Sequence, residues 1–112
     1  MPGPDTPRVD LVPGTLEMLA LRVLAVEPLH GYAIAQQIHR SSRAALTIEE
    51  GSLYPALQRM LIKGWVKAAW KTSATGRRAR IYTITAAGRR QLGEAEARFH
   101  ATFAAVARVL KG

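Results

Sequence analysis

The chain has 112 residues, of which 48% are hydrophobic, and this length allows one domain with a core of ordinary size. The absence of Cys excludes disulfide scaffolds, thiol chemistry and Cys-ligated zinc. Sixteen Lys and Arg residues against eight Asp and Glu residues give a net charge of +8, typical of a protein that binds a polyanion. Residues 1–5 do not resemble a signal peptide, and Arg22 and Glu27 interrupt the most apolar stretch. We therefore expect a cytoplasmic protein with no membrane partner.

The positive charge is concentrated in one part of the sequence. Residues 51–93 contain no acidic residue and nine basic ones: Arg59, Lys63, Lys67, Lys71, Arg77, Arg78, Arg80, Arg89 and Arg90. A basic surface that only serves solubility would scatter these charges and mix in acidic groups. The segregation therefore favours a nucleic acid as the partner.

The first helix is predicted to follow a proline-rich start. Residues 1–13 hold four of the six prolines, and we expect them to form a flexible lead-in. The helix begins at Thr15, whose hydroxyl can cap it, and ends before Pro28. Its apolar residues spread around most of the circumference, which is typical of a helix at the centre of a core.

Two further helices are predicted before residue 65. One opens at 30–32 and ends at 41–43, and a short β-branched piece at 46–48 separates it from the next. The third helix begins after Ser52, a good N-cap, and ends at Gly64 in a left-handed conformation. Pro55 is then expected in the first turn, where a helix needs no N–H donor.

Alternating residues predict two strands after the third helix. They cover 65–71 and 80–84, and a Gly-containing loop joins them into a basic hairpin. A final helix is expected from about Thr85 to Leu110, with Gly88 as a candidate point of interruption.

Three helices followed by a basic hairpin is the order of a winged helix-turn-helix domain. We therefore predict a mainly α fold with a small β-hairpin, comprising a winged helix-turn-helix domain over 14–88 and a dimerisation helix over 89–112. In such a domain the third helix enters the major groove, and the hairpin, or wing, lies over the adjacent backbone or minor groove. The predicted DNA contacts are Ser52, Tyr54, Pro55, Gln58, Arg59, Lys63, Lys71, Arg77, Arg78 and Arg80.

Some of these positions have a structural alternative. Tyr54 can instead pack as a tyrosine that covers the core, and Arg77 with Arg78 can form a solvated turn. If they do contact DNA, we expect Arg59 to affect which sequences are preferred and Arg77 to contact phosphates.

The final helix carries a heptad-like apolar seam, with Glu96 as its one polar member. An apolar stripe on a helix that leaves its domain needs a partner surface. We expect a symmetric homodimer, which suits a palindromic DNA site, and packing back on the same domain is the alternative. The predicted interface residues are Leu92, Phe99, Phe103, Val106 and Leu110.

Five segments in order and spacing resemble the PadR family of transcriptional regulators: LEMLAL at 16–21, HGYAI at 30–34, GSLYPAL at 51–57, GWV at 64–66 and RIYTITAAGR at 80–89. The resemblance extends from about residue 13 to residue 92. Two departures are Ile62-Lys63, where the family commonly has an acidic residue before the helix-ending glycine, and a C-terminal part with room for one helix. The chain thus resembles the shorter subfamily.

The resemblance implies a dimeric repressor that binds double-stranded DNA at a palindromic operator through the segment 51–63. It also implies a response to small aromatic or drug-like ligands. Within the dimer, the candidate ligand-binding residues are Met18, Phe99 and Phe103, which we expect between the first and last helices.

We expect no enzyme activity, no cofactor and no metal. The three His residues are scattered without metal-ligand spacing, and the acidic residues form no catalytic pair. The alternatives that remain are a non-specific architectural protein that binds nucleic acid, and an adaptor that uses a winged-helix fold to bind protein.

Overall fold

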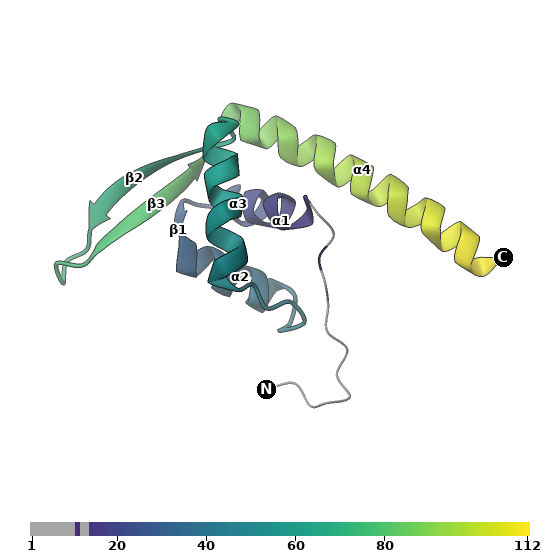
Figure 1. Cartoon of the computed structure of the whole chain (residues 1–112), viewed down its shortest axis with the longest axis horizontal. Coiled ribbons are helices and arrows are strands. Elements are labelled where there is room, and N and C mark those ends of the chain that lie inside the picture. Colours follow the sequence, from purple (N-terminus) through teal and green to yellow (C-terminus); the bar gives the residue numbers. More distant parts are fainter. Residues whose placement is uncertain (1–10, 12–13) are drawn as a thin grey trace.

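The computed structural model describes residue 11 and residues 14–112. Within them the elements are α1 (Thr15–Leu24), β1 (Leu29–His30), α2 (Gly31–Ser41), α3 (Glu50–Ile62), β2 (Val66–Thr72), β3 (Arg78–Ile84) and α4 (Ala86–Lys111). The β2–β3 hairpin extends from one side of the helices and α4 from the other (Figure 1). This is a winged helix-turn-helix fold with an added C-terminal helix, so the predicted fold class is confirmed. The predicted lead-in over 1–13 lies outside the described residues, apart from residue 11.

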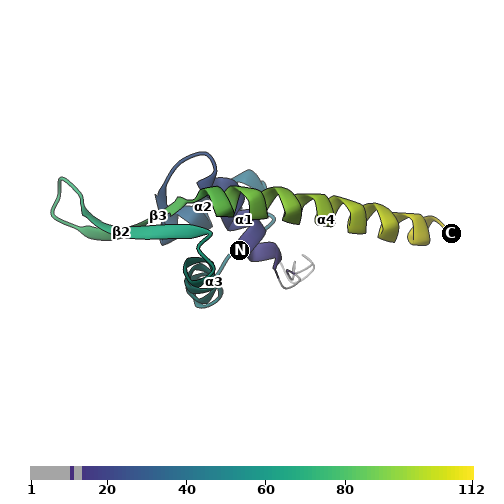
Figure 2. The same cartoon turned by 90° about the horizontal axis from the view of Figure 1, so that it is seen from above.

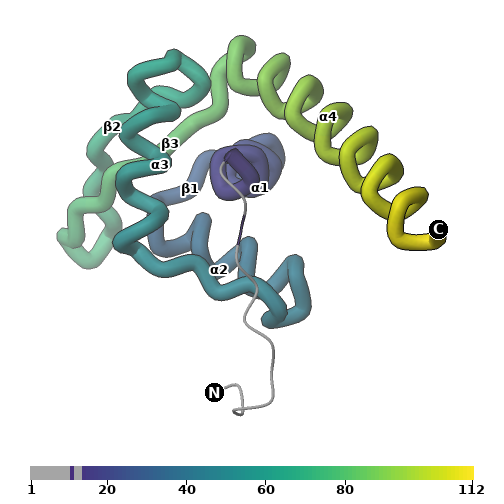
Figure 3. The backbone as a smooth tube through the Cα atoms, turned by 45° about the vertical axis from the view of Figure 1, so that its right-hand side comes forward, coloured from purple at the N-terminus to yellow at the C-terminus, as the bar shows by residue number. Residues whose placement is uncertain are grey.

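Helix α1 lies at the centre of the core, as its apolar pattern predicts. Figure 3 shows it nearly end-on, with α2, α3, β3 and α4 arranged around it. Leu21 and Leu24 are almost completely buried, and they share one apolar cluster with Ile34 of α2 and with Leu53 and Met60 of α3. The position of α3 is therefore fixed by its packing against α1.

Both predicted N-caps are wrong, by one residue in α1 and by three residues in α3. Helix α1 begins at Thr15, but its N-cap is Gly14, which has a left-handed φ of 89° and no side chain to cap the helix. Helix α3 begins at Glu50, two residues before the predicted cap Ser52. A carboxylate in the first turn is favourable at the positive end of the helix dipole, which explains the earlier start.

The sheet contains a strand that the sequence did not predict. Strand β1 has only two residues and pairs antiparallel with β3, so the strand order is β1-β3-β2. A strand of two residues carries no readable alternation. The β-branched piece at 46–48 belongs to neither a helix nor a strand, and its Leu46 and Ile48 pack against the core.

The wing ends in an ordered loop. The ladder of β2 and β3 continues to Thr72 opposite Arg78. Beyond it, the Ser73 N–H donates to the Arg77 carbonyl at 2.7 Å, and the Gly76 N–H donates to the Ser73 carbonyl at 2.9 Å. Gly76 has a φ of 81°, a conformation that favours glycine. The loop therefore holds Arg77 at a defined turn.

Thr85 joins three elements at the base of the wing. Its N–H donates to the Trp65 carbonyl at 3.0 Å, and its hydroxyl donates to the Gly64 carbonyl at 2.6 Å. The same hydroxyl oxygen accepts from the Gly88 N–H at 3.0 Å and so caps α4. The end of α3, the start of β2 and the start of α4 are thereby held together. Helix α4 continues through Gly88 without interruption.

Gly88 allows α4 to approach the main chain at Trp65, directly before β2. A Cβ atom at this position would lie 2.1 Å from the Trp65 carbonyl oxygen and 2.8 Å from Cγ1 of Ile84. Both distances are shorter than van der Waals contact, and the carbonyl belongs to the main chain. A side chain here would therefore push α4 away from the base of the wing.

We expect Gly88→Ala to lower the free energy of unfolding by about 1–3 kcal/mol, because the methyl group overpacks this junction. The matched control is Gly93→Ala in the same helix, where a Cβ would have no neighbour within 4 Å. The control should raise stability by up to about 1 kcal/mol through helix propensity. Denaturant titration measures both, and equal stability of the two variants would contradict the close contact.

Candidate nucleic-acid interface

The outward face of α3 is defined by the residues that its other face buries: Leu53, Ala56, Leu57 and Met60. Helical geometry turns the opposite positions toward solvent. The centre of this outward face consists of exposed residues, namely Gly51, Pro55, Gln58 and Ile62. Two of the predicted DNA contacts, Pro55 and Gln58, therefore lie at its centre, and exposed Ile62 is an apolar neighbour that is not among the predicted contacts.

Pro55 lies inside α3, and this corrects the prediction that it occupies the first turn. A proline has no N–H, so the bond that would reach the Gly51 carbonyl is missing. Gly51 is exposed, so solvent can satisfy this carbonyl. The second turn of α3 thus presents a proline ring and a main-chain acceptor at the outward face.

Tyr54 packs against α2 and remains partly exposed. A Cβ atom at Gly31 would lie 2.9 Å from ring carbon Cε1 of Tyr54 and 3.3 Å from its hydroxyl oxygen. The ring therefore rests on the glycine at the start of α2, and 46% of the residue is still accessible. The packing role proposed as the alternative is present, and an edge of the ring stays available on the outer surface.

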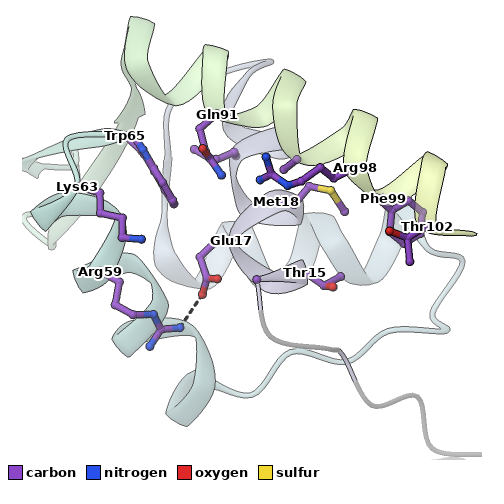
Figure 4. Close-up of a pocket in the computed structure, with 13 residues that line it drawn as sticks. Thr15, Glu17, Met18, Arg59, Lys63, Trp65, Gln91, Arg98, Phe99 and Thr102 are labelled. Carbon is purple, nitrogen blue, oxygen red and sulfur yellow. Dashed lines mark hydrogen bonds and ion pairs between the residues drawn. The ribbon is translucent and has the colours of Figure 1, made fainter.

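Arg59 turns away from the outward face. Its Nη2 donates to Oε1 of Glu17 on α1 at 2.6 Å (Figure 4). Arg59 is 56% exposed, whereas Glu17 is only 14% exposed. Arg59 is therefore a predicted DNA contact whose guanidinium already binds an acidic partner from another helix. Its contact with bases stays a prediction, and that contact requires the ion pair to open.

Ser52 and Lys63 lie on the same flank of α3 as Arg59. Ser52 is exposed and is near Arg59 by helical geometry. The Lys63 ammonium lies 4.8 Å from the ring centroid of Trp65, within the range of a cation–π contact. This flank faces the space between α1 and α4.

A cavity of about 440 Å³ occupies that space. Its lining includes Met18 and Phe99, two of the three candidate ligand-binding residues, but not Phe103. Figure 4 shows that Arg59, Lys63 and Trp65 border one end and that Met18, Arg98 and Phe99 lie toward the other. The cavity therefore combines aromatic walls with cationic groups. The candidate ligand-binding residues named from the sequence did not include Trp65, and the pairing of Glu17 with Arg59 was not predicted.

The predicted wing contacts are all exposed: Lys71, Arg77, Arg78 and Arg80. The strand register places these residues on different faces of the hairpin. Arg78 and Arg80 lie on the face of the hairpin that includes Trp70, Lys71 lies on the opposite face, and Arg77 belongs to the loop. In Figure 2 the hairpin extends past the helices, with α3 below it and α4 reaching in the other direction. The wing thus presents cations on both faces and at its turn.

The predicted seam of α4 is divided between two roles. Leu92 is buried in the core of its own domain, so its assignment to a dimer interface is corrected. The other seam residues remain exposed: Phe99, Phe103, Val106 and Leu110. The rings of Phe99 and Phe103 stack with their centroids 6.2 Å apart. Beyond its first turns, α4 therefore carries an apolar stripe that its own domain does not cover.

Across residue 11 and 14–112, no helix has the length and apolar character needed to cross a membrane. In the same part of the chain, no group of three His, Cys, Asp or Glu residues is placed to hold a metal ion.

Comparisons with known proteins agree with this geometry. The sequence profile of the transcriptional regulator PadR-like family matches residues 20–94. An uncharacterised protein of Lysinibacillus sphaericus is 30% identical over 87 residues, which span 78% of this chain and 80% of that protein. Among solved structures, a PadR family transcriptional regulator from Eggerthella lenta is 32% identical, with a TM-score of 0.76 over 87% of this chain and 82% of that one.

A transcriptional regulator from Clostridium thermocellum has the same fold, with a TM-score of 0.78 and 22% identity over 85% of this chain and 92% of that one. The family profile covers the second half of α1, helices α2 and α3, the sheet and the first turns of α4. These are the elements that build the outward face of α3 and the wing. The chain belongs to the PadR-like family of transcriptional regulators.

Proposed function

We propose that this chain is a dimeric, cytoplasmic repressor that binds one class of palindromic duplex DNA and is released by a small aromatic effector. The observation that carries the proposal is the combination of an exposed α3 face with a wing whose cations are exposed. No acidic residue interrupts residues 51–93, which include the whole wing and all of α3 after its first residue, Glu50. Such a surface attracts phosphates over its whole length.

The dimensions of α3 suit the major groove. Its 13 residues correspond to a rod of about 20 Å, and the groove of B-DNA is about 12 Å wide and admits one helix. Gln58 at the centre of the outward face can bond to base edges, and adenine is the preferred partner of a glutamine side chain. The wing supplies phosphate contacts beside it.

We expect binding to duplex DNA to weaken steeply with salt, with a log–log slope of about −5 to −9 for a dimer that makes several phosphate contacts per subunit. Gln58→Ala should change which duplexes are preferred after selection from a random pool. Arg77→Ala should weaken all duplexes alike and make the slope shallower by about 1 per subunit. Fluorescence anisotropy titrations at several salt concentrations measure both effects.

The same titrations separate the alternatives. An architectural protein would bind all selected and unselected duplexes with similar affinity, and an adaptor would not bind DNA. Either outcome, or a slope near zero, contradicts the proposal. A selected palindrome would also fix the spacing of the two half-sites.

The exposed apolar stripe of α4 supports dimerisation. Phe103 is 66% exposed and Leu110 is 80% exposed on a helix that projects from the domain. A side chain of this size contributes on the order of 2 kcal/mol when it is buried by a partner. A symmetric pair of such helices would also place two α3 helices for a palindromic site.

We expect the double variant Phe99→Glu, Phe103→Glu to be a folded monomer that binds its operator much more weakly, because burying these charges in the interface is unfavourable. The matched control is Ala97→Glu, Ala101→Glu, which adds the same charges at the same spacing on the opposite side of α4, where both residues are exposed. Sedimentation velocity distinguishes monomer from dimer. A persistent dimer in the phenylalanine variant would place the interface elsewhere, for example on α1.

The cavity between α1, α3 and α4 supports an effector site. It is lined by Met18, Trp65 and Phe99, and it adjoins the ion pair between Glu17 and Arg59. An occupant therefore contacts the same groups that connect α3 to α1. It releases DNA only if it prefers the arrangement of the two α3 helices that does not fit the operator.

A planar aromatic ligand is expected to quench Trp65 fluorescence and to weaken operator binding about tenfold, which needs about 1.4 kcal/mol of coupling. In the variant Trp70→Phe the quenching should persist, because Trp65 lines the cavity and Trp70 lies on the wing. In Trp65→Phe the quenching should be lost. Ligands that quench without changing the DNA titration would contradict regulation through this cavity.

A further inference from the structure

The wing carries an exposed indole beside two arginines. Trp70 is 59% exposed although it belongs to a strand whose inner end is buried. In the register, Trp70 lies opposite Arg80, Thr72 opposite Arg78, and Ala68 opposite Tyr82. Residues directly opposite each other in an antiparallel ladder share one face of the hairpin. The indole and both guanidinium groups therefore belong to the same face of the wing.

Aromatic rings hold both arginines on this face. The guanidinium carbon of Arg78 lies 5.0 Å from the Trp70 ring centroid, and that of Arg80 lies 5.8 Å from the Tyr82 ring centroid. Both distances are within the range of cation–π contacts. Tyr82 is buried at the core end of the sheet, whereas Trp70 lies toward the loop. The series therefore alternates ring and cation from the core to the end of the wing.

Core packing does not account for the exposed indole. Val66 and Ile84, on the same face, are buried and fill the base of the hairpin. Trp70 lies beyond them, and its contact with Arg78 takes place at the surface. A guanidinium that stacks on an aromatic ring keeps its charge and its outer N–H groups, and it loses less side-chain freedom on binding than a mobile one. The ring therefore holds the Arg78 guanidinium in place while leaving it able to bind a narrow anionic site.

We propose that Trp70 is a positioning residue through which the wing selects a narrow, A·T-rich minor groove beside the site read by α3. A narrow minor groove has an enhanced negative potential that attracts an inserted arginine. In this arrangement Trp70 holds the Arg78 guanidinium extended, and Arg78 enters the groove. The inference rests on the proposed function, because it requires α3 to bind a defined site nearby.

Three duplexes test the inference, all with the same selected central site and with flanks of A·T, G·C or inosine·C pairs at the position of the wing. Inosine lacks the N2 amino group of guanine, so an inosine·C pair shows only acceptors in the minor groove and leaves the major-groove pattern of G·C unchanged. The wild-type protein is expected to bind the A·T and inosine·C flanks more tightly than the G·C flank.

Trp70→Ala and Arg78→Ala should each lower the ratio of the affinity for the A·T flank to that for the G·C flank by about two- to five-fold per wing. This fold-change corresponds to the free energy of a cation–π contact at an exposed site. The double variant should lose no more than either single variant, because both act through one contact. Trp70→Phe should retain part of the preference. The matched control is Lys67→Ala on the opposite face of the hairpin, which should weaken binding to all three flanks by the same factor.

Equal weakening of all three duplexes by Trp70→Ala would overturn the inference, as would a flank preference that this variant leaves intact. Thermal unfolding of each variant should give the wild-type midpoint, because residue 70 lies outside the apolar core. If the proposed function itself is wrong, the wild-type protein will select no central site from a random pool. Selection of a site without any flank preference overturns the inference alone.

Discussion

The hydrogen bonds of Thr85 and the close contact at Gly88 determine how α3, the wing and α4 are joined. One threonine binds the carbonyls of Gly64 and Trp65 and caps α4 through Gly88. The end of α3, the base of the wing and the start of α4 therefore meet within a few residues. Because the missing side chain of Gly88 lets α4 lie against the main chain at Trp65, the direction in which α4 leaves the domain is fixed at this point.

The regular pattern of the chain predicted most of the fold. The three helices, the hairpin and the central position of α1 follow from apolar periodicity and from the prolines and glycines between elements. The exceptions have specific physical causes. Strand β1 is two residues long and depends on pairing with β3, which no local pattern records. Helix α3 begins at Glu50 because a charge near the helix dipole can replace a side-chain cap, and Pro55 is tolerated inside it on an exposed side.

The candidate interface was predictable as a region but less so residue by residue. The segregation of positive charge identified α3 and the wing, because counting charged residues along the sequence is enough to detect such a region. Contacts between distant segments were not visible: Arg59 meets Glu17 across 42 positions, and Leu92 belongs to the core although it fits the heptad. Val109 is exposed but lies off the heptad rows, so a search for that repeat passes it over. The partners of long charged side chains depend on tertiary packing, which a single sequence does not specify.

Because α4 is long, a small tilt at the Thr85 junction corresponds to a large displacement at the other end of the helix. The helix has 26 residues and is therefore about 39 Å long. If its far end is held by a second subunit, a tilt of about 5° at its start displaces the DNA-contacting domain by about 3 Å, by simple lever geometry over that length. Half-sites on DNA recur at about 34 Å, and two domains displaced in opposite directions would miss that repeat by about 6 Å. A change too small to alter any single hydrogen bond at the junction could thus decide whether both subunits fit one operator.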